Sequence, residues 1–197
     1  MILATRNRHK LAEMADLLPG VELRPLPPGV ELPPETGATF EANALIKARA
    51  ARGRGTEAVI ADDSGIEAAD LGGEPGIYSA RYAGEGVGDE VNLAKLLREV
   101  DAAGGDRRAA YVCALALIDE AGEEHVFEAR CEGRLLDERR GDGGFGYDPA
   151  FVPDDTGPDD NRTMAELSAA EKNAISHRGR AVRMLAEHLG SALERSP

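Results

Sequence analysis

The chain has 197 residues, which is enough for one large domain or for two lobes that share a sheet. Its formal charge of −13 argues against general nucleic-acid binding, because an acidic surface repels phosphate backbones. No apolar run approaches the ~20 residues that a membrane span needs. We therefore expect neither nucleic acid nor membrane as a partner.

Cysteine usage and the N-terminus indicate the compartment. Cys113 and Cys131 lie in apolar, strand-like segments, and no spacing typical of zinc ligands occurs. The N-terminus shows no charged region followed by an apolar one, so we expect no signal peptide. These features predict reduced core thiols in a cytoplasmic protein.

The hydrophobic pattern predicts alternating strands and helices in the first half of the chain. Thr39 is placed to cap one helix and Gly53 to end it. Closely spaced prolines before that helix predict a stiff loop. The elements predicted here are strands over 1–4 and 21–24, helices over 9–18 and 40–52, a buried strand that stops at 61, and a glycine-rich looped region over 72–88.

The second half contains a predicted hairpin between helices. Ser168 and Glu171 form a capping-box pattern that predicts a helix start. The other elements predicted here are helices from about 89 to 100 and from about 176, paired strands over 109–118 and 124–135, and a short strand over 150–152. Together these elements predict an α/β fold whose sheet is not purely parallel.

Two adjacent acids follow an apolar run. Asp62 and Asp63 come directly after residues 58–61, so we expect the acid pair to cap a buried strand. Glu35, in the proline-rich loop, is a third acid. Magnesium favours oxygen ligands, and a remaining acid can deprotonate a water molecule. An exposed turn is the competing interpretation of the pair.

The turn from Thr5 to Lys10 joins the first strand to the first helix. A helix N-terminus attracts anions through its free N–H groups and its dipole. Thr5 and Asn7 add short polar groups, and Lys10 adds a charge. The pattern is not a P-loop, so an ordinary capped helix remains an alternative for this turn alone.

A glycine-rich loop over 141–149 carries two of the eight aromatic residues, Phe145 and Tyr147. An aromatic ring on such a loop suits stacking on a nucleobase, and packing into the core is an equal alternative. Lys172, His177 and Arg178 cluster near capped helix starts. A cation at a helix N-terminus is unfavourable without an acceptor, which favours a ligand there.

Taken together, these motifs resemble the inosine/xanthosine triphosphate pyrophosphatase family. Each motif alone is weak, but they follow the family's order over nearly the whole chain. The segments that carry the resemblance are Thr5 to Lys10, Glu35 to Asn43 with Lys47, Ala61 to Gly65 with Pro75 to Tyr82, Gly143 to Pro149, and Glu171 to Gly179.

The resemblance implies an α/β fold with an elongated mixed central sheet, two lobes and the active-site cleft between them, in a single nucleotide pyrophosphatase domain over 1–197. It implies a homodimer and Mg²⁺ as the cofactor. The implied reaction converts ITP, dITP or XTP to the monophosphate and pyrophosphate, which removes deaminated purines from the nucleotide pool.

The same resemblance implies the roles of individual residues. Asp63 matches the catalytic proton acceptor, and Glu35 and Asp63 match the metal-site acids. The residues that match substrate contacts are Thr5, Arg6, Asn7, Arg8, His9, Lys10, Ser64, Phe145, Gly146, Tyr147, Asp148, Lys172, His177 and Arg178.

Base selection follows from hydrogen bonding. Donors satisfy the 6-oxo group of hypoxanthine or xanthine and oppose the amino group of adenine. We expect Phe145 to stack on any purine, and His177 and Arg178 to carry the preference. Two alternatives remain: a pyrophosphatase for another base, such as a modified pyrimidine, and a non-catalytic nucleotide-binding module. The acids and lysines argue against the second.

Arg6 departs from the family pattern, which usually has glycine at this position. If the position requires a positive φ, arginine is strained by about 1 kcal/mol or more. Alternatively, the Arg6 side chain adds a phosphate contact.

Overall fold

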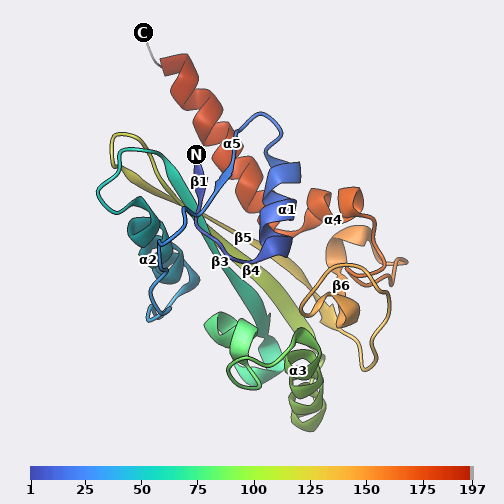
Figure 1. The fold of residues 1–197 in the computed structure, drawn as a ribbon. Coiled ribbons are helices and arrows are strands. Elements are labelled where there is room, and N and C mark those ends of the chain that lie inside the picture. Colours follow the sequence, from blue (N-terminus) through green and yellow to red (C-terminus); the bar gives the residue numbers. More distant parts are fainter. Residues whose placement is uncertain (196–197) are drawn as a thin grey trace. The chain divides into compact units, whose positions relative to one another are not determined.

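A computed structural model describes residues 1–195, apart from the side chains of residues 8 and 192–195 (Figure 1). The helices are α1 (Arg8–Leu17), α2 (Phe40–Arg52), α3 (Asp89–Ala103), α4 (Ala169–Ile175) and α5 (His177–Arg195). The strands are β1 (Ile2–Leu3), β2 (Arg24–Pro25), β3 (Val59–Ala68), β4 (Arg108–Ile118), β5 (Glu124–Leu135) and β6 (Phe151–Pro153).

The strands form one mixed sheet, which confirms the predicted α/β class. Its order is β2-β1-β3-β4-β5-β6. β1 pairs in parallel with both β2 and β3, whereas β5 pairs antiparallel with β6. The short β2 lies later than the predicted 21–24, because Arg24 and Pro25 are the residues in register with Ile2 and Leu3.

The chain divides into two compact units. Unit 1 comprises residues 1–63, 113–129 and those from 178 onward, and unit 2 comprises residues 64–112 and 130–177. β3, β4 and β5 each contribute residues to both units. The units are therefore described separately below.

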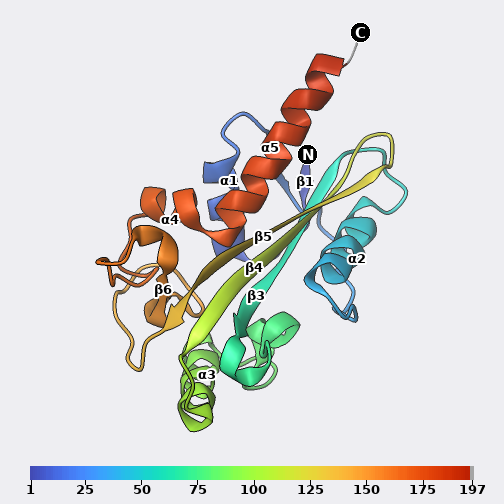
Figure 2. The same cartoon turned by 180° about the vertical axis from the view of Figure 1, so that it is seen from behind.

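Unit 1 has its core between sheet strands and two helices. Leu3, Ile60 and Leu115 of the strands form one buried cluster with Met14 of α1 and Leu185 of α5. Figures 1 and 2 show α2 on the other side of these strands from α1 and α5. Thr39 caps α2 by accepting from the backbone N–H of Ala42, and Gly53 ends the helix, as predicted. The cap therefore sets the residue at which α2 begins.

Unit 2 has a separate core under α3. Leu93 and Leu96 of α3 cluster with Ile66 of β3, Tyr111 of β4 and Phe151 of β6. The glycine-rich region predicted as loop over 72–88 contains the short 3₁₀ turn Gly76–Arg81, and another such turn, Ala69–Leu71, directly precedes it. The predicted capping box is present at the start of α4.

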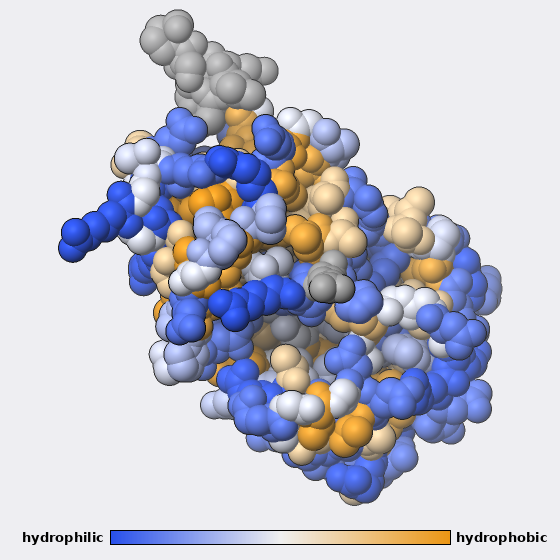
Figure 3. Space-filling model, viewed as in Figure 1, coloured by the Kyte–Doolittle hydropathy of each residue, from blue (hydrophilic) through white to orange (hydrophobic). Residues whose placement is uncertain are grey.

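The polar face of the molecule (Figure 3) agrees with a sequence in which 30% of the residues are charged. Polar residues cover much of the face seen in Figure 3, with apolar patches between them. Within the described part of the chain, no helix combines the length and the apolar character needed to cross a membrane.

Candidate active site

The acid pair lies inside a strand, so the prediction that the strand stops at 61 is wrong. β3 runs from Val59 to Ala68 and passes through Asp62 and Asp63. Both acids are buried, with 2% and 5% of their surface exposed. Adjacent strand residues point to opposite faces, so each carboxylate can meet its own cations. Those cations allow the strand to continue through the acids.

Asp62 pairs with two cations in unit 1. Lys10 Nζ lies 2.8 Å from Asp62 Oδ2, and the Arg178 guanidinium donates to the same oxygen at 3.2 Å. Arg178 also pairs with Glu13 of α1. Burial alone would raise the pKa of Asp62, but Lys10, Arg178 and Lys47 together hold that pKa well below its ordinary value. Asp62 therefore remains ionised.

Asp63 is held by α2. Lys47 Nζ donates to Asp63 Oδ1 at 2.8 Å and to Glu35 Oε1 at 2.9 Å. The Asn43 side-chain amide donates to Asp63 Oδ2 at 3.2 Å, and its oxygen accepts from the backbone N–H of Gly37. Asn43 and Lys47 are one helical turn apart, so the same face of α2 presents both.

The charges around Asp63 leave its site electronegative. Burial raises the pKa of Asp63, Lys47 opposes this, and the nearby Glu35 carboxylate raises it further, so the pKa is raised overall. Burial lowers the pKa of Lys47, but the negative charges of Asp63, Asp62 and Glu35 outweigh it and raise that pKa. The raised pKa of Lys47 reports an excess of negative charge around its ammonium group, whereas the raised pKa of Asp63 is due mainly to burial.

This excess fits a divalent cation. The carboxylates of Glu35 and Asp63 are hard oxygen donors of the kind that Mg²⁺ prefers. In the structure, a single ammonium group, Lys47 Nζ, contacts both of them. Glu35 and Asp63 are therefore the residues that would hold Mg²⁺ in unit 1.

The predicted phosphate turn is a capped helix start. The Asn7 side-chain oxygen accepts from the backbone N–H groups of His9 and Lys10, and Thr5 Oγ1 accepts from the N–H of Asn7. Asn7 thus acts as the N-cap of α1. The turn directs Lys10 to Asp62, which brings the helix terminus to the acid cluster.

Arg6 is not strained, because its φ is not positive. Its guanidinium donates to the backbone oxygen of Val30 at 2.9 Å, so it ties the turn to the proline-rich loop. His9 is exposed. The side chain of Arg8 lies outside the described residues.

The second group of predicted residues lies in unit 2, around the Asp148 carboxylate. Oδ2 accepts from Lys172 Nζ at 2.8 Å and from the N–H of Phe145 at 2.9 Å, and Oδ1 accepts from the Tyr111 hydroxyl at 3.0 Å. Lys172 Nζ also lies 4.9 Å from the centre of the Phe145 ring. Gly144 is required here, because its φ is 69° and a Cβ would lie 2.1 Å from Asp148 Oδ2.

The other predicted residues of unit 2 have different environments. The Tyr147 hydroxyl donates to the Ser79 carbonyl at 2.7 Å, and Tyr147 is buried, so it anchors the loop. The N–H of Gly146 donates to Asp89 Oδ2. His177 is buried and stacks on Tyr111. Ser64 is half-buried in β3.

The structure thus brings the predicted residues into two groups. Unit 1 groups Lys10, Glu35, Asp63 and Arg178, and unit 2 groups Phe145, Asp148, Lys172 and His177. The sequence analysis singled out Asp62 in the acid pair, and Asn43 and Lys47 within a family segment, without giving any of them an individual role. It did not identify Glu13 or Tyr111. The four-residue spacing of Asn43 and Lys47 was a usable signal, whereas nothing local marked Tyr111.

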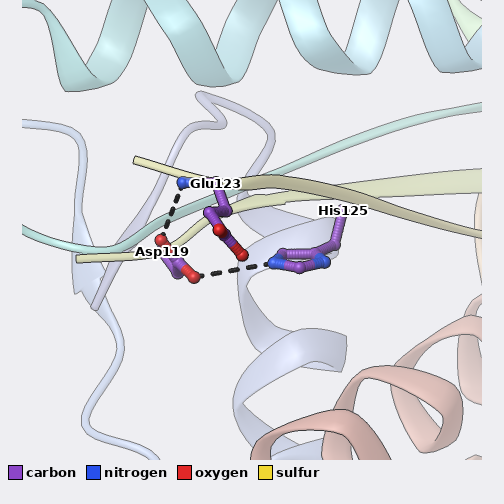
Figure 4. A group of neighbouring side chains, drawn as sticks. All are labelled: Asp119, Glu123 and His125. Atoms are coloured by element: carbon purple, nitrogen blue, oxygen red, sulfur yellow. Dashed lines mark hydrogen bonds and ion pairs between the residues drawn. The ribbon is translucent and has the colours of Figure 1, made fainter. Parts of the chain in front are cut away.

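Asp119, Glu123 and His125 form a separate group at the turn between β4 and β5 (Figure 4). Asp119 Oδ1 accepts from the N–H of Glu123 at 2.9 Å, and Oδ2 lies 3.5 Å from His125 Nε2. These contacts close the hairpin, so we assign the group to the turn.

Comparison with known proteins places this geometry in a family. The model of the Ham1 family matches residues 1–188. A dITP/XTP pyrophosphatase of Geobacter sulfurreducens is 46% identical, covering 96% of each chain, and one of Mycolicibacterium paratuberculosis is 48% identical, covering 94% of this chain and 93% of its own. The chain belongs to the Ham1 family.

Solved structures of Ham1 proteins agree with the fold. The Coxiella burnetii HAM1 protein has a TM-score of 0.86 at 40% identity, covering 96% of this chain and 98% of its own. The Staphylococcus aureus Ham1 protein has a TM-score of 0.85 at 40% identity, covering 97% and 98%. Ham1 membership confirms the resemblance inferred from the sequence motifs.

Proposed function

We propose that this protein hydrolyses the non-standard purine nucleoside triphosphates ITP, dITP and XTP to the monophosphate and pyrophosphate, and so removes deaminated purines from the nucleotide pool. The observation that carries this proposal is the buried acid cluster, in which Asp63 contacts both Lys47 and Asn43. The Ham1 relatives named dITP/XTP pyrophosphatase support the substrate class.

Asp63 is the proposed general base. It takes a proton from water, the water oxygen bonds to the α-phosphorus, and the bond from that phosphorus to the bridging oxygen breaks to release pyrophosphate. The raised pKa of Asp63 makes it a stronger base than an exposed aspartate. Lys10 and the N-terminus of α1 provide positive charge for the phosphates.

Glu35 and Asp63 are the proposed ligands of Mg²⁺. When bound, Mg²⁺ supplies charge neutralisation at phosphate oxygens. Binding of Mg²⁺ requires the Lys47 side chain to shift, because its ammonium group contacts the same two carboxylates. We assign Lys47 the task of holding both acids in place until Mg²⁺ binds them.

Base recognition is assigned to unit 2. Phe145 is half-buried and offers a ring face, and Lys172 and His177 offer donors to a 6-oxo purine. Lys172 is fixed by Asp148, so its ammonium is already oriented. A site built from donors favours hypoxanthine and xanthine over adenine.

Pyrophosphate release from ITP, XTP, dITP, GTP, ATP and dUTP, each with and without Mg²⁺, tests the proposal. We expect magnesium-dependent release that is fastest with the 6-oxo, non-standard purines. Preference for dUTP would favour a pyrimidine pyrophosphatase. Binding of nucleotide without release from any substrate would favour a non-catalytic module.

Glu35→Gln should raise the Mg²⁺ concentration needed for half-maximal activity by about tenfold or more, because one charged ligand becomes neutral. Activity at saturating Mg²⁺ should fall less. Glu31→Gln is the matched control, since Glu31 lies in the same loop and is exposed. An unchanged magnesium titration in Glu35→Gln would remove Glu35 from the ligand set.

We also propose that the enzyme is a cytoplasmic homodimer. Cys113 and Cys131 are both buried thiols outside any disulfide, in keeping with a reducing compartment. Sedimentation equilibrium at micromolar concentration should give twice the monomer mass of 20.9 kDa. A mass near 20.9 kDa would contradict the dimer.

A further inference from the structure

Tyr111, in β4, contacts His177, which is assigned to base recognition, and Asp148, which fixes Lys172. Its side chain is buried, with 7% exposed. Its hydroxyl donates to Asp148 Oδ1 at 3.0 Å, and its ring stacks on His177 with centroids 4.7 Å apart and planes 5° from parallel. The Phe151 ring lies edge-on at 4.8 Å. One side chain therefore supports two segments that are distant in sequence.

The first contact fixes Asp148. Lys172 and the Phe145 N–H hold one carboxylate oxygen, and the Tyr111 hydroxyl holds the other. Burial and the charge of Asp148 raise the pKa of Tyr111, so the phenol remains a donor. With both oxygens engaged, the Asp148 carboxylate has a set orientation, and so does Lys172, which is bound to it.

The second contact fixes His177. A parallel ring stack restricts rotation of the imidazole, because any turn about its long axis drives an edge into the Tyr111 ring. His177 is itself buried, with 5% exposed. The plane in which His177 can offer a hydrogen bond is thus set by Tyr111.

We propose that Tyr111 is a positioning residue for base selection. Its hydroxyl keeps Asp148 bound to Lys172, and its ring keeps His177 in plane, so that the donors assigned to the 6-oxo group keep their directions. If Asp148 is released, its carboxylate can accept from the adenine amino group, and discrimination weakens. This inference rests on the proposed function.

Tyr111→Phe tests the hydroxyl while keeping the ring. We expect kcat/KM for ITP to fall about tenfold, which corresponds to one lost hydrogen bond to a charged group, while the slow reaction with ATP is unchanged or faster. The fall in kcat/KM should appear mainly as a higher KM, because Asp63 and Lys47, which serve the chemical step, are unchanged. Tyr78→Phe is the matched control, since Tyr78 is an exposed tyrosine of the same unit.

Binding separates positioning from folding and from turnover. In an Asp63→Asn background, the Kd for ITP should rise about tenfold with Tyr111→Phe while the Kd for ATP does not rise. The NMR signals of the His177 ring should keep their ring-current shift in Tyr111→Phe and lose it in Tyr111→Leu.

The outcomes are distinct. Equal losses for ITP and ATP, or an unchanged ITP/ATP ratio, would overturn the role of Tyr111 while leaving the proposed function intact. A wild-type enzyme that does not prefer ITP over ATP would overturn the proposed function and this inference with it.

Discussion

Asp63→Asn should reduce ITP turnover by about 10²–10⁴-fold, because the amide cannot accept the proton that water must lose. The geometry of the site should change little. Asn43 can still contact residue 63, and Lys47 keeps its ion pair with Glu35 at 2.9 Å. Single-turnover measurements at saturating Mg²⁺ should place the loss in the chemical step.

The fold should tolerate this substitution. A folded-state pKa above the ordinary value means that ionised Asp63 opposes folding at neutral pH, so a neutral amide removes that cost. We expect the melting temperature to stay within about 4 °C of wild type, equivalent to ~1 kcal/mol. Glu132→Gln, an exposed strand acid, is the control. Near-normal ITP hydrolysis by Asp63→Asn would exclude Asp63 as the base.

Local signals in the sequence predicted most of the elements. The helix start at Thr39 and the capping box of Ser168 and Glu171 were predictable, because a cap acts over about three residues. The hairpin strands were predictable because the apolar run of β4 and the mixed polar and apolar segment of β5 flank an obvious turn.

Contacts between distant segments were not predictable in the same way. The strand appeared to stop at Ala61 because two buried acids are costly without cations. One of those cations, Arg178, lies 116 residues from Asp62 along the chain. Tyr111 was missed for the same reason, since its partner Asp148 is 37 residues away and belongs to another element.

His177 and Arg178 are adjacent in sequence but contact different partners. His177 and Arg178 are neighbours at the start of α5, and both were expected to select the base. In the structure, His177 stacks on Tyr111 in unit 2, whereas Arg178 pairs with Asp62 and Glu13 in unit 1. Consecutive residues at a helix start point in different directions, so a shared motif does not imply a shared partner.

Arg178→Met should therefore slow ITP and ATP hydrolysis by similar factors. The Arg178 side chain is 2% exposed, and its loss leaves Asp62 with Lys10 as its close ion-pair partner and removes the guanidinium from Glu13. Breaking a buried pair by removing one partner typically costs about 3–5 kcal/mol. For a chain of this size, this corresponds to a fall in melting temperature of roughly 6–20 °C. Thermal denaturation and assays well below the lowered melting temperature measure the two effects separately.

Two further variants make the test decisive. Arg178→Lys should recover only part of the stability, because an ammonium group lacks the planar fork that reaches both Asp62 and Glu13. His177→Gln should lower the ITP/ATP ratio, since it alters a donor assigned to the base. If Arg178→Met lowers that ratio instead, while His177→Gln leaves it unchanged, Arg178 reads the 6-oxo group and its pairing with Asp62 must open when the nucleotide binds.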